Sequence, residues 1–278
     1  KPEFEQTLRE LAVRGDIIKT MHRAMSGTGR DVDVSGFALH GEQPGDPILG
    51  RLVERGLQDE LKASAYAIID GIDGRTHHVS FADLELAGDA KAGALVEARS
   101  YEDAKGKQRL SLAVRSDLTL QEQSTARGAT WLDRQLLARE PLPPGGRFGA
   151  ELRNAMEQRV DYLANEGLAH RQAQRGVFAR DLLETLRRRE LDETIKKISA
   201  DHGISYRPSA EGEHVAGIFR QRVILSSGRF AMIDDGLGFQ LVPWRPVLDK
   251  HLGKQVSGVM MPGDWVDWSF GRKRGLGL

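Results

Sequence analysis

The sequence contains no cysteine and no long uninterrupted run of apolar residues within its 278 positions. The absence of cysteine excludes a disulfide scaffold, a cysteine-ligated zinc site and a thiol nucleophile. A membrane-spanning helix needs about eighteen or more apolar residues in succession, so we expect no membrane partner. No basic segment followed by an apolar one opens the chain, and we therefore expect no secretory leader.

An excess of charge of either sign is also missing, because 40 basic and 40 acidic residues give a formal net charge of zero. This balance argues against a protein that wraps nucleic acid by charge alone. The charges are nevertheless unevenly placed. Residues 1–126 contain 16 basic and 21 acidic residues, whereas residues 127–278 contain 24 and 19. The C-terminal half is therefore the part that we expect to meet a polyanion.

The N-terminal segment is predicted to form a helix. Apolar residues recur every three or four positions over residues 2–25, and the Ser-Gly-Thr-Gly sequence at residues 26–29 then interrupts the pattern. We expect residues 1–29 to be a docking or connecting helix. Residues 30–47, which are rich in Gly, Pro and Asp, are expected to be a linker.

A first small β-barrel is predicted over residues 48–126. The hydrophobic pattern changes there to strict alternation, which favours strands at residues 48–53, 66–70, 76–81, 94–99 and 109–114. A short helix is expected at residues 82–86, between the third and fourth strands. Five strands in this order are typical of an OB-like or SH3-like barrel.

Residues 127–203 are expected to form a helical module that resembles a winged helix. Thr130 and Asp181 are candidate N-caps of its first and third helices, and Gly167 is a candidate terminator of the second. A hairpin at residues 168–178 would form the wing. Such domains often serve protein contacts as well as DNA contacts, so both roles stay open for this module.

A second small β-barrel is predicted over residues 204–278, and it resembles the first. Residues 66–71 match residues 230–235, and residues 48–52 match residues 215–219, although the spacing between the two matches differs by three positions. Internal similarity of this kind indicates a repeated unit, with chance likeness between small barrels as the alternative. The predicted fold is thus α+β, with two OB/SH3-like barrels flanking a helical module and an N-terminal helix.

No catalytic motif is found. The sequence has no phosphate-binding loop of the Gly-x-x-x-x-Gly-Lys-Ser/Thr type, and we predict no cofactor. His77 and His78 are adjacent, so on a regular strand they would face opposite sides and could hardly ligate one metal ion. A paired-carboxylate role for Asp234 and Asp235 stays an alternative to a turn.

The positive signals favour binding, because arginines mixed with aromatic residues can pair phosphates and stack bases. The alternatives are that the tryptophans belong to the core and that the arginines are merely solvated. The candidate nucleic-acid-binding residues are Arg171, Arg175 and Arg180 around the hairpin, and Arg220, Arg222, Arg229, Trp244, Arg245, Arg272, Lys273 and Arg274 in the second barrel.

Five phrases of the sequence resemble the C-terminal region of conjugative relaxases, the nucleases that mobilise plasmids and integrative elements, in the class of the agrobacterial border endonuclease. They are GDII (residues 15–18), ATWLDRQL (129–136), SGRFAMIDDG (227–236), FQLVPW (239–244) and GRKRGL (271–276). In such relaxases a separate N-terminal domain holds the catalytic tyrosine and a metal-binding histidine cluster. No matching motif is present here and the chain opens without Met, so the resemblance implies a C-terminal fragment that lacks the nuclease.

The resemblance implies a non-catalytic accessory region in the bacterial cytoplasm, which holds single- or double-stranded DNA near the transfer origin. The alternative is an interaction module that docks the relaxase onto the type IV secretion coupling protein or other relaxosome subunits. A third hypothesis, an enzyme with a dispersed hydrolase or nuclease site, is also kept. No catalytic residue is carried over from the family to this chain.

Overall fold

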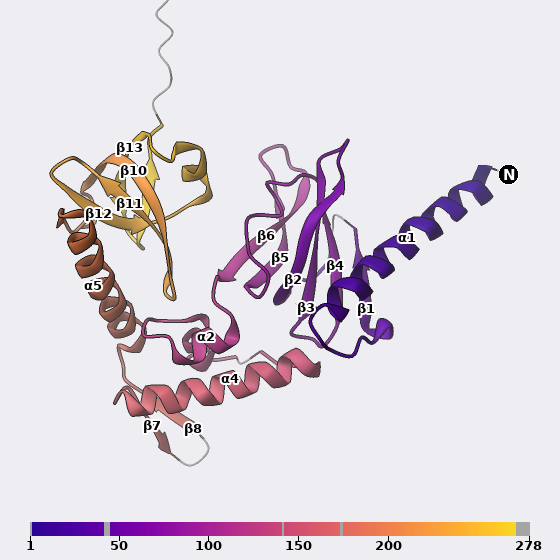
Figure 1. Ribbon diagram of the computed structural model, residues 1–278, viewed down its shortest axis with the longest axis horizontal. Coiled ribbons are helices and arrows are strands. Elements are labelled where there is room, and N and C mark those ends of the chain that lie inside the picture. The colour runs from indigo at the N-terminus through magenta and orange to yellow at the C-terminus, as the bar shows by residue number, and fades with distance from the viewer. Residues whose placement is uncertain (1, 42–44, 141, 173–174, 271–278) are drawn as a thin grey trace, which may run out of the picture. The chain divides into compact units, whose positions relative to one another are not determined.

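The computed structural model describes residues 2–41, 45–140, 142–172 and 175–270 (Figure 1). It is a mixed α+β structure with an N-terminal helix and two sheets, as the sequence predicts at this coarse level. Each sheet has six strands instead of the predicted five, because the sequence does not predict the short strands β1 (Phe37–His40) and β9 (Ser205–Tyr206). The chain divides into unit 1, Lys1–Ala126 with Thr130–Ala179, and unit 2, Arg127–Ala129 with Arg180–Leu278. No helix in the described ranges is both long enough and apolar enough to cross a membrane.

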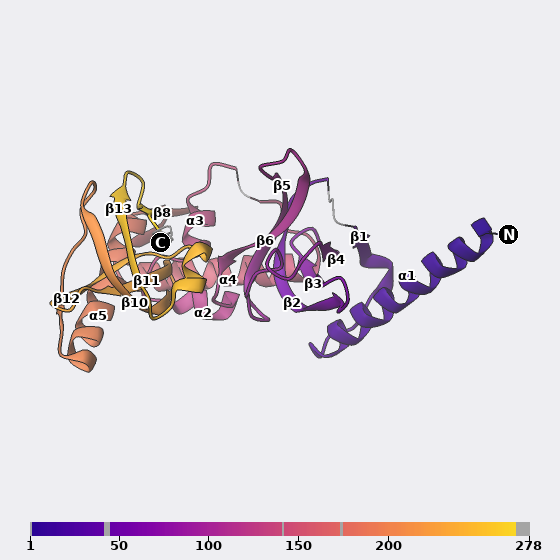
Figure 2. The same ribbon diagram turned by 90° about the horizontal axis from the view of Figure 1, so that it is seen from above.

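The predicted N-terminal helix is confirmed as α1 (Pro2–Ser26). Its C-terminal turns pack on the sheet of unit 1, where Met21 and Ala24 contact Ile68. The N-terminal half extends past that sheet in both views (Figures 1 and 2). Its apolar residues are therefore exposed, with Phe4 at 68% and Leu11 at 59%.

Unit 1 contains a six-stranded sheet with the order β1-β4-β3-β2-β5-β6. The strands are β1 (Phe37–His40), β2 (Ile48–Asp59), β3 (Ser64–Gly71), β4 (Thr76–Phe81), β5 (Leu95–Glu102) and β6 (Gln108–Ser116). All neighbours are antiparallel except β1 and β4, which are parallel. One face buries an apolar cluster that includes Leu52, Phe81 and Val96.

Three helices follow the sheet in unit 1: α2 (Leu120–Thr125), α3 (Trp131–Leu136) and α4 (Gly146–Asn165). Thr130 caps α3 as predicted, and its hydroxyl accepts the backbone N–H of Asp133. Gly167 has a φ of 71°, the left-handed conformation expected just past the end of α4. The hairpin of β7 (Ala169–Gln172) and β8 (Arg175–Phe178) comes next, where the wing is predicted.

A fully buried ion pair joins α3 to α4. Arg159 Nε and Nη2 donate to the two carboxylate oxygens of Asp133 at 2.8 and 2.9 Å, and neither side chain is exposed to solvent. Arg159 Nη1 donates to the carbonyl oxygen of Ala126. Asp133 also accepts the backbone N–H of Thr130, so one carboxylate both caps a helix and neutralises the buried guanidinium.

A second ionic network joins α4 to the sheet of unit 1. Arg30 and Arg51 each bind both Asp70 and Glu151, at nitrogen–oxygen distances of 2.7–2.9 Å. Burial raises the pKa of Asp70, and the Arg51 guanidinium opposes that rise. Because every charge in this network has partners within it, we assign it the role of positioning α4.

Unit 2 contains helix α5 (Leu182–His202) and a six-stranded sheet with the order β14-β13-β10-β11-β12-β9. The strands are β9 (Ser205–Tyr206), β10 (His214–Leu225), β11 (Gly228–Asp234), β12 (Gly238–Pro243), β13 (Gln255–Met261) and β14 (Trp265–Trp268). A short 3-10 helix spans Pro246–His251. One face of the sheet buries the cluster that contains Val215 and Phe219, and the other packs Met232 against Ile198 of α5.

The two sheets have the same topology, strand for strand. In each, a short first strand pairs in parallel with the fourth, and the other pairs are antiparallel. Each second strand has a bulge at the same place, after Leu52 in β2 and after Phe219 in β10. The carbonyl oxygen of Leu52 accepts the N–H of Gly93, and that of Phe219 accepts the N–H of Gly253. The repeated unit predicted from the sequence is therefore supported by equivalent backbone geometry.

Several details differ from the predictions. Neither sheet closes into a barrel, because no ladder in the described parts of the chain joins β1 to β6 or β9 to β14. Residues 37–40, inside the expected linker, form β1, because an edge strand this short carries little periodic signal. Residues 82–86 form turns, not a helix.

The helical segment at residues 127–203 is shared between the two units, because α5 packs on the sheet that follows it. The predicted order of two helices, a hairpin and a third helix gave no sign of this division. Asp181 precedes α5, but its side chain makes no capping bond to the helix backbone. One carboxylate oxygen of Asp181 instead accepts the hydroxyl of Thr185 at 3.0 Å.

Candidate nucleic-acid interface

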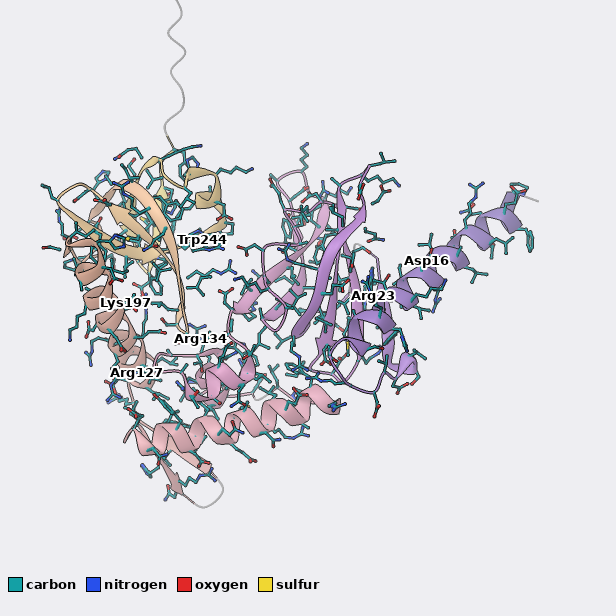
Figure 3. All side chains as sticks on the ribbon, viewed as in Figure 1. Asp16, Arg23, Arg127, Arg134, Lys197 and Trp244 are labelled. Atoms are coloured by element: carbon teal, nitrogen blue, oxygen red, sulfur yellow. The ribbon has the colours of Figure 1, made fainter. Side chains whose placement is uncertain are left out.

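Trp244 is the centre of a group of aromatic and basic side chains in unit 2, where Figure 3 labels it. The guanidinium carbon of Arg222, on β10, lies 4.9 Å from the centre of the indole ring, and that of Arg229, on β11, lies 5.2 Å away. Both separations are within the roughly 6 Å range of cation–π attraction. We call these three residues the Trp244 cluster.

Strand register explains why the two arginines meet. Arg222 is paired across the hairpin with Ala231, and Arg229 precedes Ala231 by two positions. Alternation along a strand places both arginines on the face that carries Ala231 and the apolar core. Trp244 reaches the same face after β12, where its backbone N–H donates to the carbonyl oxygen of Arg229 at 2.9 Å.

The Trp244 cluster is partly buried at the margin of this core. Trp244 packs against the cluster of buried apolar residues, and the Arg222 side chain is 29% exposed. Arg222 Nη1 lies 3.7 Å from a carboxylate oxygen of Asp249. The indole N–H is buried and has no acceptor among the described residues. Packing and the guanidiniums therefore hold the ring, while both arginines keep a surface toward solvent.

Arg220 does not join the cluster, although the sequence groups it with Arg222 and Arg229. It is the extra residue of the bulge between Phe219 and Gln221. Phe219 faces the apolar core before the bulge, whereas Val223 faces α5 after it, so the side-chain alternation is reset at Arg220. Arg220 Nε instead donates to a carboxylate oxygen of Asp234 at 2.9 Å.

The other predicted residues are distributed along the chain. Arg245 stacks on Trp265 at 5.0 Å from its ring centre. Arg171 belongs to unit 1, where it pairs with Asp161 at 2.6 Å on an exposed surface, and Arg180 is an exposed residue of unit 2. Arg175 lies in β8. Arg272, Lys273 and Arg274 lie outside the described residues.

The adjacent histidines face opposite sides of β4, as the sequence predicts. His78 stacks on Tyr66 at 5.3 Å between ring centres, whereas His77 stacks on His40 at 5.1 Å. Burial lowers the pKa of His78 to about 4. In the part of the chain that the structure describes, no group of three or more His, Asp or Glu side chains is arranged to hold a metal ion. Asp234 and Asp235 lie at the β11–β12 turn, where each accepts backbone N–H bonds.

Sequence reasoning missed Asp249, which approaches Arg222, and it missed the contact between His40 and His77. Asp249 lies in the 3-10 helix, far along the chain from β10, so only the folded topology brings the two together. No local signal for the contact between His40 and His77 exists in the sequence, because the parallel pairing of β1 with β4 creates it.

Comparison with known proteins gives one match. The protein family described as "Protein of unknown function (DUF3363)" matches residues 1–107 and 97–277, which together span nearly the whole chain. No curated protein and no solved structure matches the sequence. The chain therefore belongs to the DUF3363 family.

Proposed function

We propose that this chain is a non-catalytic, nucleic-acid-binding region of a conjugative relaxase, which holds transfer-origin DNA while the strand is processed and transferred. The observation that carries the proposal is the Trp244 cluster, in which two arginines are ordered around one indole ring. Residues of these types bind nucleic acid without an active site, so no catalytic group is required of this chain.

The physical argument rests on preorganisation. A guanidinium offers five N–H donors in a planar fork that matches phosphate, and it can also stack on a base. Contact with Trp244 fixes the position of both guanidiniums, which reduces the side-chain entropy lost when DNA binds. Nearby, Arg245 is ordered on Trp265 in the same way. This repeated Arg–Trp pairing within unit 2 favours a binding role for this unit.

The resemblance to small nucleic-acid-binding folds is part of the same proposal. We propose that each six-stranded sheet is an open variant of an OB-like or SH3-like fold, and that the hairpin between α4 and α5 is the wing of a winged helix. The proposed setting is the bacterial cytoplasm. The proposed partners are transfer-origin DNA and relaxosome proteins.

The test of DNA binding uses the full chain and fluorescence anisotropy. Labelled single- and double-stranded oligonucleotides are titrated over a series of salt concentrations. We expect binding to at least one form, with an affinity that falls linearly on a log–log plot against salt, because phosphate contacts release counterions. Absence of binding to both forms at low salt would contradict the proposal.

A second candidate function is docking to the type IV coupling protein or other relaxosome subunits. It is favoured by α1, on which Phe4, Leu8 and Leu11 are 68%, 49% and 59% exposed. Such apolar side chains at helical spacing are suited to a groove on another protein. Changing all three to Ser should abolish capture of the purified coupling protein and leave DNA affinity unchanged. Capture that is undiminished would exclude α1 as the docking surface.

A further inference from the structure

A groove with a volume of about 670 Å³ lies between α1 and β1 in unit 1. Its charged lining consists of Arg9, Arg14, Arg75 and a single carboxylate, Glu10, and His40 also lines it. The remaining wall is formed by apolar residues of both elements. The groove therefore carries an excess of positive charge, in the unit whose sequence is acidic overall.

None of the three guanidiniums in the groove is held in an ion pair by the described residues, although the charge of Arg75 helps to lower the pKa of Asp73. No carboxylate in the described ranges forms an ion pair with Arg9, Arg14 or Arg75. Glu10 accepts a hydrogen bond from the amide of Gln6 on its own helix. An anion entering the groove would therefore meet guanidiniums that need no prior release from an acidic partner.

A chain of hydrogen bonds joins His40, which lines the groove, through His77 on β4 to Asp73 in the turn before that strand. His77 Nε2 lies 3.0 and 3.1 Å from the two carboxylate oxygens of Asp73, and His77 Nδ1 lies 2.9 Å from His40 Nε2. A carboxylate only accepts, so His77 Nε2 must donate to Asp73. In a neutral ring His77 Nδ1 is then an acceptor, which makes His40 Nε2 the donor of the second bond.

This arrangement leaves one ring nitrogen, His40 Nδ1, for a ligand. This nitrogen makes no hydrogen bond to the described residues, yet it is not one of the buried polar atoms without a partner. It is therefore open to the solvent or to the groove. Burial, together with the charge of the nearby Arg75, lowers the pKa of His40. An anion would oppose both effects by stabilising the protonated ring, whose charge the chain through His77 to Asp73 also compensates.

We propose that this groove binds a phosphate group, held by Arg9, Arg14 and Arg75 and by the Nδ1–H of a protonated His40. A phosphate offers several acceptor oxygens, which fit both the guanidinium forks and the imidazolium donor. The site belongs to unit 1 and shares no residue with the Trp244 cluster. Phosphate binding in the groove is therefore independent of the proposed DNA-binding role. The phosphate can be inorganic or can belong to a mononucleotide.

The test is an NMR titration of the full chain with labelled histidine side chains, using inorganic phosphate at constant ionic strength. We expect the His40 ring signals to shift saturably while those of His78, which does not line the groove, stay unchanged. Arg14→Ala or Arg75→Ala should each weaken binding about tenfold, the loss that follows from one charge-assisted hydrogen bond. A shift that does not saturate would overturn the proposal.

A matched control separates the groove from general charge on α1. Lys19 is an exposed cation on the same helix, pairs with Asp16 at 3.7 Å and does not line the groove. Lys19→Ala should leave phosphate affinity unchanged within twofold. An equal loss in Lys19→Ala and Arg14→Ala would overturn the proposal, as would unchanged affinity in His40→Gln.

Two further titrations distinguish the source of the phosphate and the role of the proton. If a mononucleotide binds through its phosphate, the corresponding nucleoside should not bind, and equal affinity for both would contradict the proposal. Sulfate, which does not titrate near neutral pH, should bind more tightly as the pH falls from 8 to 6. The charged or titratable groups that act on His40 in this range are His77, Arg75 and Asp73, and Arg9, Glu10 and Arg14 line the same groove from α1.

Discussion

Gly50 and Gly217 occupy equivalent positions in the two sheets, each directly against a backbone carbonyl of the neighbouring strand. A Cβ atom on Gly50 would lie 2.3 Å from the carbonyl oxygen of Asp70, and one on Gly217 would lie 2.4 Å from that of Asp234. Both glycines precede a bulge that follows Leu52 or Phe219. The close approach of two strands thus requires glycine at the same point of each repeated unit.

Alanine at either glycine is expected to destabilise its own unit. The added Cβ would force the strands apart, at a cost of about 1–3 kcal/mol in the free energy of unfolding. Urea denaturation gives the size of the loss, and amide hydrogen exchange shows which sheet opens. Gly15→Ala is the control, because no atom lies near its Cβ position in α1, and it should stabilise by roughly 0.5–1 kcal/mol. Wild-type stability in both Gly50→Ala and Gly217→Ala would contradict the shared packing requirement.

Loss of the buried Arg159 guanidinium is expected to be far more costly than loss of an exposed one. Arg159→Met would leave the Asp133 carboxylate buried without its partner, which costs about 3–5 kcal/mol. Arg171→Met removes an arginine that pairs with Asp161 at the surface, so its cost should be at most about 1 kcal/mol. Chemical denaturation of both variants measures the difference. Equal losses would show that the buried pair has no special role in unit 1.

Stability is expected to decrease in mild acid because of His78. The folded-state pKa of His78 is lowered by burial from 6.5 to about 4. The unfolded state therefore binds the proton first, so this contribution is fully present above about pH 6.5 and is lost as the pH falls toward 4. The total change is about 3 kcal/mol for a shift of this size. The difference in unfolding free energy between the wild type and His78→Gln, measured across this range, isolates the effect, and a difference independent of pH would contradict it.

Local features of the sequence predicted much of this fold. The period-two pattern located the strand at residues 76–81 and much of β3, and the threonine at position 130 marked the start of α3. These signals act between residues that are close in sequence. The matching segments in the two halves also predicted two sheets of like topology. Similar segments form equivalent strands in the two sheets, and each strand has an equivalent neighbour.

The parts that could not be predicted depend on contacts between distant residues. The bulge at Arg220 reverses which side chains face the core, and no local pattern marks it. β1 pairs with a strand more than thirty positions later, and His40 meets His77 only through that pairing. Likewise, the sequence grouped Arg220, Arg222 and Arg229 on one hairpin, but only the register shows that two of them converge on Trp244.

The central claim is that the Trp244 cluster contacts nucleic acid, and it predicts a specific effect of removing its two arginines. A control pair is available on α5, which packs on the other face of the same sheet and carries the exposed Arg188 and Lys197, the latter labelled in Figure 3. Replacing Arg222 and Arg229 by Ala removes the same charge as replacing Arg188 and Lys197. The two double variants therefore differ in where the charge is lost, not in how much.

The most direct measurement is the salt dependence of oligonucleotide affinity for the wild type and these two double variants. Each phosphate contact on a single strand contributes about 0.7 to the log–log slope, so loss of Arg222 and Arg229 should reduce its magnitude by about 1.4. Affinity at low salt should fall in parallel, and the α5 variant should keep the wild-type slope. An unchanged slope after removal of Arg222 and Arg229, or an equal reduction in both double variants, would contradict the account.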